Sequence, residues 1–439
     1  MQQYLDLYTS QRQALCSHSA PVMNALRDEA LAAFRTAGFP TKKVERYRYT
    51  DIAPLFAPDY GLNILRLPLH DDPCEAFRCD VLIGNRHPYY IVNDTLQGGH
   101  EQQDVIVCPL TEAARDYPDI VGRHYGKAAS VGGDSITALN TMLAQDGLFV
   151  YVPKNVCAEH DIQIINLLHS DVDLMVNRRV LIVVEEGAQV KLLFCDHAAD
   201  DRHFLTTQVT EAFIGRGATL DLYSMEETHA KNVCVNNLYI RQAAASRAYH
   251  NIITLHNGIT RNRTDLTLEG PGAECELCGC VVADKVQHVD NNTLIEHKAP
   301  HCTSHELYKY VLDDKATGAF AGRVLVDREA QHTVSDEVNR NITTTKQARM
   351  FTQPMLEIYA DDVKCSHGST VGQLNDAALF YMRQRGISLK EAKVMLETAF
   401  VGEVIDHIRI ASLRERLHYL LDRRFHGELN KCAGCKLCQ

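Results

Sequence analysis

The chain has 439 residues, more than one compact hydrophobic core usually accommodates, so two or three domains are expected. Its formal net charge of −11 argues against a nucleic-acid-binding surface. The longest strongly apolar stretch, residues 180–184, is far too short to span a bilayer, and the first residues lack the basic and apolar regions of a secretory signal. We therefore expect a cytoplasmic protein that contacts neither nucleic acid nor membrane.

Residues 1–147 are predicted to form an N-terminal domain of helical or mixed structure. Within it, residues 21–37 have the pattern of one amphipathic helix, because apolar side chains recur four positions apart. These side chains are Val22, Leu26, Ala30 and Phe34.

Residues 148–372 are predicted to form a β-rich core. Short runs of β-prone residues follow one another, and Gly, Asn and Asp separate them. Such a succession predicts a sandwich, a barrel or a solenoid, and the turns do not recur at one strict period that would favour the solenoid. Asparagines near the breaks could form ladders at the corners or serve only as turn residues. They include Asn236, Asn237, Asn291, Asn292, Asn339 and Asn341.

Residues 373–429 are predicted to form a C-terminal helical domain, and residues 430–439 a flexible tail that carries cysteines. Two apolar stripes mark the helices, and they exceed what a lone terminal hairpin needs, so we expect a partner to cover part of them. The stripes consist of Leu396, Phe400, Val404 and Ile408, and of Leu413, Leu417, Leu420 and Leu421.

The segment CSHGSTVG places Cys365 two residues before His367. In an extended strand these side chains project to the same face, where a thiolate and an imidazole could bind iron, zinc or copper. The spacing alone nevertheless favours a polar turn that closes the β region.

Two other groups of cysteines stand out. Cys275, Cys278 and Cys280 would lie on opposite faces of a strand, which is poor geometry for a shared metal site. The tail cysteines have the spacing C-x2-C-x2-C, but a zinc or cubane site normally needs a fourth ligand. Metal binding by the tail and a neutral tail both remain open. The tail cysteines are Cys432, Cys435 and Cys438.

Motifs of the common enzyme classes are absent from the sequence. There is no complete phosphate-binding loop and no H-E-x-x-H, G-x-S-x-G or G-x-G-x-x-G signature. A carbohydrate-active enzyme would need two carboxylates on one face. The adjacent pairs Asp313–Asp314 and Asp361–Asp362 would point to opposite faces of a strand. We therefore expect no enzymatic activity, including no ATP hydrolysis.

Several segments resemble one known family. The run IYADDVKCSHGSTVGQLNDAALFYMRQRGIS, residues 358–388, resembles the C-terminal signature of the SufB/SufD family of SUF iron–sulfur cluster assembly scaffold proteins, and is closer to its SufD branch. Residues 287–326 and 138–156 are similar to the core region of that family. FPTKKVERYRYTDIAPL resembles its motif P-T-x-x-x-E-x-W-x-Y-T-D, with Tyr47 in place of the usual Trp. The resemblance covers most of the chain.

The resemblance implies a mainly β fold with α flanks, in which a right-handed parallel β-helix core lies between N-terminal and C-terminal helical domains. It also implies a complex with the homologous SufB and the ABC-type ATPase SufC, which would dock on residues 387–425 and hydrolyse ATP. That complex builds nascent iron–sulfur clusters, and the SufD branch is linked to iron entry. In the family, the histidine of the C-S-H-G segment lies at the SufB–SufD interface and is needed for assembly. This role would fall to His367, with weaker support for Cys365.

Under this interpretation the chain is a non-catalytic scaffold without a stably bound cofactor. Iron or a cluster would be present transiently at the partner interface, with His367 as an iron ligand. A β-helix exposes strand edges on its end rung, where SufB could pair by strand addition. The isolated chain could instead form a homodimer. The alternative function is a stand-alone metal-binding or redox protein that uses the cysteine tail.

Overall fold

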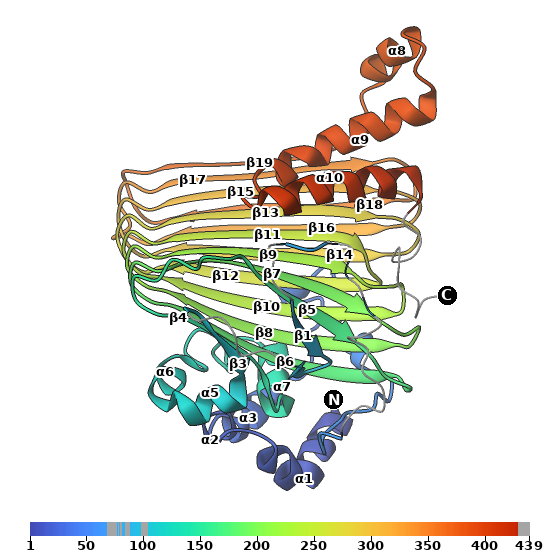
Figure 1. Cartoon of the computed structure of the whole chain (residues 1–439). Coiled ribbons are helices and arrows are strands. Elements are labelled where there is room, and N and C mark those ends of the chain that lie inside the picture. Colours follow the sequence, from blue (N-terminus) through green and yellow to red (C-terminus); the bar gives the residue numbers. More distant parts are fainter. Residues whose placement is uncertain (68–76, 78, 80, 84–87, 98–103, 429–439) are drawn as a thin grey trace.

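The computed structural model describes residues 1–67, 77, 79, 81–83, 88–97 and 104–428. Its centre is a parallel β-solenoid of about 8 turns, flanked by helices at both ends of the chain (Figure 1). This confirms the mainly β fold with α flanks. The strand β4 begins at Gly147 and β19 ends at Gly372, while the division of the chain into domains stays a prediction.

The solenoid consists of two sheets between which the chain alternates, so each strand pairs in parallel with the strand two elements later. The first sheet contains β5 (Ile162–Leu168), β7 (Gln189–Ala198), β9 (Thr219–Glu227), β11 (Arg247–His256), β13 (Glu274–Ala283), β15 (Thr303–Leu312), β17 (Val334–Thr343) and β19 (Lys364–Gly372). The second sheet contains β4 (Gly147–Val152), β6 (Leu174–Val184), β8 (Phe204–Ile214), β10 (Asn232–Gln242), β12 (Ile259–Leu268), β14 (His288–His297), β16 (Thr317–Val326) and β18 (Arg349–Ile358).

The length of one turn varies along the solenoid. Val233 pairs with Ile259, 26 residues later, whereas Thr317 pairs with Arg349, 32 residues later. The paired strands keep their register because the loops that connect them differ in length. A search for one strict period therefore fails on this sequence even though the structure repeats.

Side chains of the strands alternate between the solenoid interior and the two outer faces. The interior is largely apolar and includes the buried Leu266 and Phe320. A ladder of amides crosses it, in which Asn236 donates to Asn262 (3.0 Å) and Asn262 donates to Asn291 (2.9 Å). The sequence left open whether the asparagines form ladders at the corners or serve only as turn residues. The observed ladder lies in the middle of three strands, where each amide can bond to the next rung.

The N-terminal end of the solenoid is covered by helices and short strands. The helices are α1 (Gln2–Ser17), α2 (Pro21–Asn24), α3 (Arg27–Ala37), α5 (Leu110–Asp116), α6 (Pro118–His124) and α7 (Ser135–Leu143), with short 3-10 helices at Glu45–Tyr47 and Ala53–Phe56. The strands are β1 (Tyr89–Val92), β2 (Thr95–Gln97) and β3 (Ile106–Pro109). Both β1–β2 and β3–β4 are antiparallel pairs, so the parallel stacking of the solenoid stops here.

The single helix expected over residues 21–37 is divided into α2 and α3. The break places the buried guanidinium of Arg27 against the end of α7, where it donates to the carbonyls of Met142 and Ala144, both at 2.7 Å. These bonds satisfy carbonyls that a helix end leaves without an intrahelical partner. Tertiary contact therefore overrides the continuous apolar pattern.

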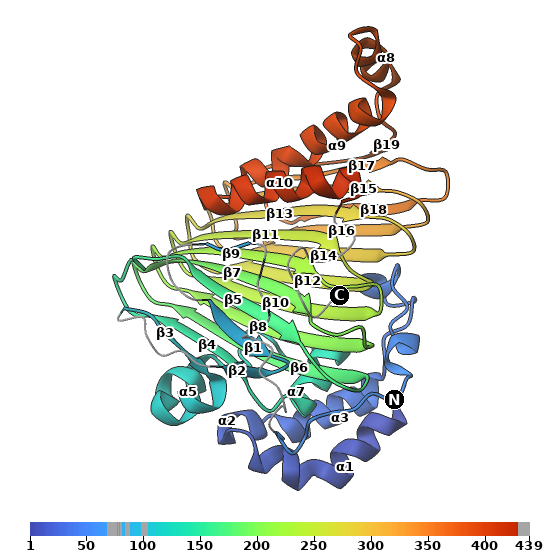
Figure 2. The ribbon, with the colours of Figure 1, turned by 45° about the vertical axis from the view of Figure 1, so that its right-hand side comes forward.

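The C-terminal helices are α8 (Asp376–Gln384), α9 (Leu389–Asp406) and α10 (Ala411–His426). Figure 2 shows α9 and α10 along the outer face of the first sheet, with α8 projecting beyond β19. A partner was expected to cover part of the two apolar stripes. The residues of the second stripe are fully buried against this chain's own first sheet. They are Leu413, Leu417, Leu420 and Leu421. No helix of the described residues is long and apolar enough to cross a membrane.

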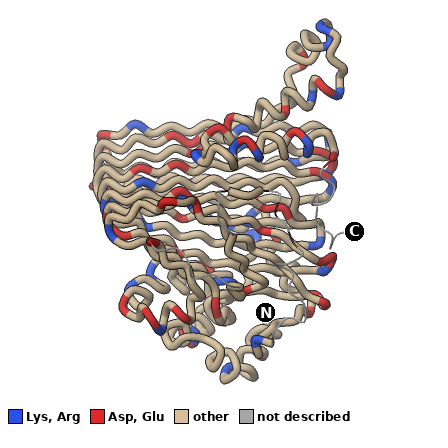
Figure 3. Tube along the Cα trace, viewed as in Figure 1, with Lys and Arg blue, Asp and Glu red and all other residues tan. Residues whose placement is uncertain are grey.

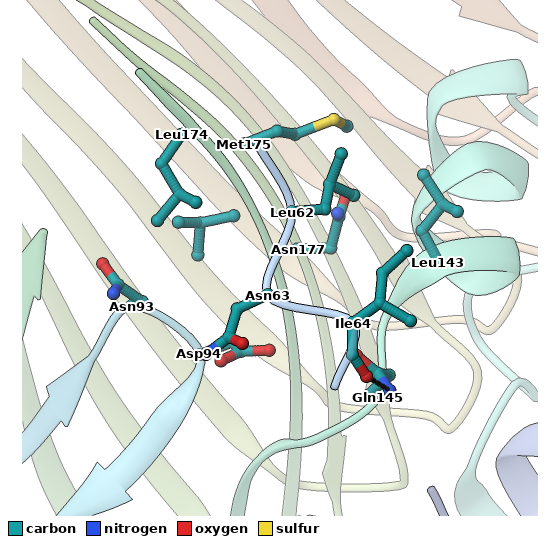
Figure 4. Close-up of a pocket in the computed structure, with 11 residues that line it drawn as sticks. Leu62, Asn63, Ile64, Asn93, Asp94, Leu143, Gln145, Leu174, Met175 and Asn177 are labelled. Atoms are coloured by element: carbon teal, nitrogen blue, oxygen red, sulfur yellow. Dashed lines mark hydrogen bonds between the residues drawn. The ribbon is translucent and has the colours of Figure 1, made fainter. Parts of the chain in front are cut away.

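A small pocket lies where residues 62–64 cross β6 (Figure 4). Leu62, Ile64, Asn93 and Gln145 contribute to its lining. Its volume of about 20 Å³ is close to that of one water molecule. The pocket is thus a packing gap under the N-terminal segment and cannot hold a substrate.

Candidate functional site

The last rung of the solenoid, formed by β18 and β19, is the candidate functional site. In the described part of the chain, each strand has one neighbour in its sheet, β16 for β18 and β17 for β19. Every side chain of these two strands is exposed or half-buried, whereas at least half of those in each preceding solenoid strand are buried. The rung therefore ends the solenoid, and no described strand covers its outer edges.

Cys365 and His367 lie within β19, so the local structure is a strand and not the polar turn that spacing alone favoured. Cys365 pairs in register with Ser335, and His367 with Glu337. Alternation along β19 therefore places both side chains on the interior side of the last rung. His367 is exposed and Cys365 is half-buried, and burial raises the pKa of the Cys365 thiol.

A column of buried carboxyl groups lies beneath His367. Glu337 is in register with His367, and Glu306 is in register with Glu337, one rung deeper. Adjacent rungs are separated by about 4.8 Å. Burial raises the pKa of Glu337 to about 9, with a contribution from Glu306, and burial raises the pKa of Glu306 to about 8. Both side chains are therefore neutral acids near pH 7.

Glu337 has no hydrogen-bond partner among the described residues, although it is fully buried. The second sheet leaves space for it, since a Cβ atom at Gly322 would lie 2.2 Å from its Oε1. A glycine at this position therefore permits the carboxyl group to cross the interior. Sequence reasoning missed this column because residues 306, 337 and 367 become neighbours only once the turn lengths are known.

Cys365 and His367 do not form a complete metal site on this chain. Groups of three or more potential ligands occur twice among the described residues, and neither group contains Cys365 or His367. The first consists of Cys79, Cys195 and His197, and the second of Glu276, Cys278 and His407. The predicted tail ligands Cys432, Cys435 and Cys438 lie outside the described residues. A metal ion at His367 would therefore need ligands from elsewhere, such as a partner.

The free edge of β19 can accept another strand. The N–H of Lys364 donates to Thr333, and the carbonyl of Thr370 accepts a bond from Asn341. Even-numbered residues of β19 therefore direct their backbone groups to the β17 side. Odd-numbered residues, including His367 and Val371, direct theirs away from β17, toward the edge that is unpaired in the described structure.

Apolar side chains are exposed around the same rung. They are Phe351 (40%), Ile358 (39%), Tyr359 (61%) and Val371 (48%), and Phe380 (65%) and Tyr381 (60%) on α8. Large exposed apolar side chains beside uncovered strand edges are typical of a protein–protein interface.

Charged residues are distributed along the chain in Figure 3. Positions of lysine and arginine are interspersed with those of aspartate and glutamate along the strand ends and the helices.

The sequence matches two family models that together span nearly all of it. Residues 167–400 match the model of the SufBD core domain, described as SUF system FeS cluster assembly, and residues 1–164 match the SufBD protein N-terminal region. The chain belongs to the SufBD family. The match to the core model covers β6 to β19, α8 and most of α9, whereas β4 falls in the match to the N-terminal region.

Curated relatives from three bacteria carry matching names. An iron–sulfur cluster assembly SufBD family protein of Synechocystis is 27% identical over 409 residues, which cover 90% of this chain and 87% of the relative. The iron–sulfur cluster assembly protein SufD of Escherichia coli is 24% identical over 407 residues, with coverage of 89% and 90%. SufD of Bacillus subtilis is 25% identical over 331 residues, with coverage of 74% and 75%. The chain is thus a SufBD family protein of iron–sulfur cluster assembly.

Proposed function

We propose that this chain is a non-catalytic scaffold subunit of a SUF-type complex, and that nascent iron–sulfur clusters are built where its β18–β19 rung meets a partner. The observation that carries the proposal is the exposed His367, with Cys365 on the same side of an edge strand and no third ligand nearby in the described structure. Such an incomplete ligand set suits a site that two chains complete. Iron and sulfide are then the cargo of the site, and no cofactor stays bound to this chain.

His367 would act on incoming iron. A neutral imidazole binds Fe²⁺, and it can also transfer a proton while iron and sulfide combine. The buried acids Glu337 and Glu306 lie beneath it in the interior column. Cys365 would support the same step as a half-buried thiol, with a smaller contribution.

The partner at the rung would be a homologue of SufB, joined by strand addition. Backbone pairing along an open edge provides affinity, and the exposed apolar side chains around it would be covered on binding. Val371→Pro removes an N–H from the free edge and should weaken the heterodimer, because proline is tolerated on edge strands but cannot donate. Thr370→Pro is the matched control: it removes an N–H directed at β17 and should instead lower the stability of the isolated chain. Equal heterodimer affinity for Val371→Pro and wild type would exclude pairing at this edge.

The ATPase SufC would dock on residues 387–425. Because the leucine stripe of α10 is already covered, the contact would use the apolar residues that remain exposed on α9 and α10. These are Leu389 (45%), Met395 (46%) and Tyr419 (49%). Met395→Asp and Tyr419→Asp should reduce co-purification of the ATPase without loss of helix content by circular dichroism. Undiminished co-purification with both variants would move the docking surface elsewhere.

The decisive experiment is His367→Ala in the assembled complex. The variant should fold and assemble normally because the side chain is exposed, whereas iron and acid-labile sulfide recovered with the complex should fall sharply. Cells that depend on this system should lose cluster-dependent growth. Normal cluster content in the variant would refute the assignment of the site. The purified chain should not hydrolyse ATP. Its cytoplasmic location stays a prediction.

The alternative, a stand-alone metal or redox protein, would place the metal in the cysteine tail. Metal analysis of the isolated chain with and without residues 430–439 separates the two functions. Metal that depends on the tail, together with failure to co-purify any partner, would favour the alternative.

A further inference from the structure

A second group of metal-binding side chains lies on the outer face of the first sheet. Glu276 and Cys278 on β13 point outward, and His407, directly after α9, lies over them. One ligand atom from each residue lies within 4.8 Å of the others. His407 Nδ1 forms an ion pair with Glu276, and the Cys278 thiol donates to Oε1 of Glu276 over 3.7 Å.

These three residues line a cavity of about 390 Å³ between β13, β15, β17 and the end of α9. His305 and Asp336, which form a second ion pair, lie in the same lining. Its described lining has one guanidinium group, that of Arg340, which pairs with Glu403, whereas Glu306 is the neutral interior acid described above. The cavity therefore gives a cation access to the carboxylate of Glu276.

We propose that Glu276, Cys278 and His407 bind a divalent transition metal ion such as Zn²⁺, in a site separate from the β18–β19 rung. A sulfur, a nitrogen and an oxygen ligand form a set that suits Zn²⁺. Ligand atoms around one tetrahedral Zn²⁺ are roughly 3.3 to 3.8 Å apart, so the present spacing needs only small side-chain movements. The fourth position is open to water or to His305.

A simple ion pair accounts for less of this geometry. Glu276 and His407 could pair without any thiol, yet Cys278 is 2% exposed and is directed at the same carboxylate. Burial, together with Glu276, raises the pKa of Cys278, so the thiol keeps its proton until a cation displaces it. The other ligand group, that of Cys79, Cys195 and His197, is buried throughout, and none of these residues lines the cavity.

Metal binding at this place would join β13 to the end of α9. Because the ligands come from the sheet and from the C-terminal helical region, the ion would stabilise the packing of these helices on the sheet. A ligand that binds only the folded state raises its stability. The proposal does not depend on the scaffold function.

The test uses the full-length chain with Cys432, Cys435 and Cys438 replaced by serine, so that the tail cannot contribute ligands. Anaerobic titration with Co²⁺ should give a thiolate-to-cobalt charge-transfer band and the visible bands of tetrahedral cobalt, and Zn²⁺ should abolish both. Cys278→Ser should remove the charge-transfer band. Cys280→Ser, a buried thiol two residues away on the same face, is the matched control and should retain it.

His407→Gln tests the site without altering a buried residue. The variant should bind Zn²⁺ at least tenfold more weakly than the parent chain. The rise in Tm that Zn²⁺ causes in the parent should disappear in the variant. A charge-transfer band that persists in Cys278→Ser, or one that is lost in Cys195→Ser instead, would overturn the proposal. So would the absence of any cobalt spectrum in the parent chain.

Discussion

The two ends of the solenoid are built from the same kind of rung but are finished differently. At the N-terminal end, every residue of β5 and β6 is buried, and β3 closes the second sheet as an antiparallel neighbour of β4. At the C-terminal end, no residue of β18 or β19 is buried, and neither strand has such a neighbour in the described structure. An uncovered edge favours association. The open C-terminal end is where the proposed function places a partner, whereas the covered N-terminal end has no comparable edge among the described residues.

Buried carboxyl groups show the same contrast. Near the N-terminal end, Glu211 pairs with Arg179 at 2.7 Å, and both side chains are fully buried. Its oxygens also accept bonds from the backbone N–H groups of Gly126, Ala128 and Ala129. Near the C-terminal end, the equally buried Glu337 has no hydrogen-bond partner in the described structure. A buried carboxylate that accepts hydrogen bonds fixes the position of the loop that donates them. A buried carboxyl group without hydrogen-bond partners lowers the stability of the fold.

The largest expected effect is that of Glu211→Gln. The change leaves the Arg179 guanidinium buried without its counter-ion and should cost roughly 3 to 5 kcal/mol in the free energy of unfolding. Denaturant titration followed by circular dichroism would measure this loss. Glu186→Gln, which breaks an exposed pair with Arg216, is the control and should change stability little. A small loss for Glu211→Gln would remove the contrast between the two ends.

Glu337→Gln should raise the free energy of unfolding at high pH, whereas Glu211→Gln should lower it. The pKa of Glu337 is raised to about 9 in the folded chain, above its ordinary value of 4.5, so the folded state holds a proton that the unfolded state has lost. The stability of the wild type should therefore fall as pH rises from about 5 to about 9. The variant, which cannot ionise, should match the wild type near pH 5. Toward pH 9 its advantage should grow by up to about 1.4 kcal/mol per pH unit, because the folded wild type holds a proton that the unfolded chain has lost.

The measurement is Tm across that pH range for both proteins. The neighbouring Glu306, whose pKa is raised to about 8, remains in the variant. Part of the pH dependence should therefore persist. Parallel curves for wild type and variant would show that Glu337 is not buried unsatisfied, and that the open end is packed as well as the covered one.

The sequence was sufficient to predict the β-rich core, the helical flanks and the family. It also indicated that Cys365 and His367 would share one face if the segment were a strand, although the spacing alone favoured a turn. It could not predict that His367 lies above Glu337, since this requires the register between rungs. Turn lengths that vary from 26 to 32 residues hide that register.

Neighbouring asparagines illustrate the same limit. Asn236 and Asn237 are adjacent and chemically identical, yet Asn236 joins the interior ladder whereas Asn237 points outward and donates to Asp134. In the C-terminal helices, the leucine stripe of α10 predicted correctly that something covers it. A stripe does not identify what covers it, and here the cover is the first sheet.

Cys365→Ser sharpens the assignment within the open end. The thiol is half-buried, and its replacement should change the free energy of unfolding by less than about 1 kcal/mol. Cluster content of the complex should fall less than it does for His367→Ala, because the imidazole is the more exposed ligand of the two. Iron and sulfide analysis of both variants, purified side by side, checks the order. A larger loss for Cys365→Ser would make the thiol the principal residue of the site.

The smallest effect is expected from the tail cysteines. The comparison of the two ends assumes that the open end owes no stability to residues 430–439, which follow α10. Three cysteines fall one ligand short of a four-ligand structural site, and the first sheet already covers the leucine stripe of α10. Replacing Cys432, Cys435 and Cys438 with serine should therefore leave Tm unchanged in differential scanning calorimetry, with and without a chelator. A large drop in Tm, reproduced by chelation of the wild type, would reveal a structural metal site. The tail would then act as a cover for the C-terminal helices, and the two ends would be less different than the described residues indicate.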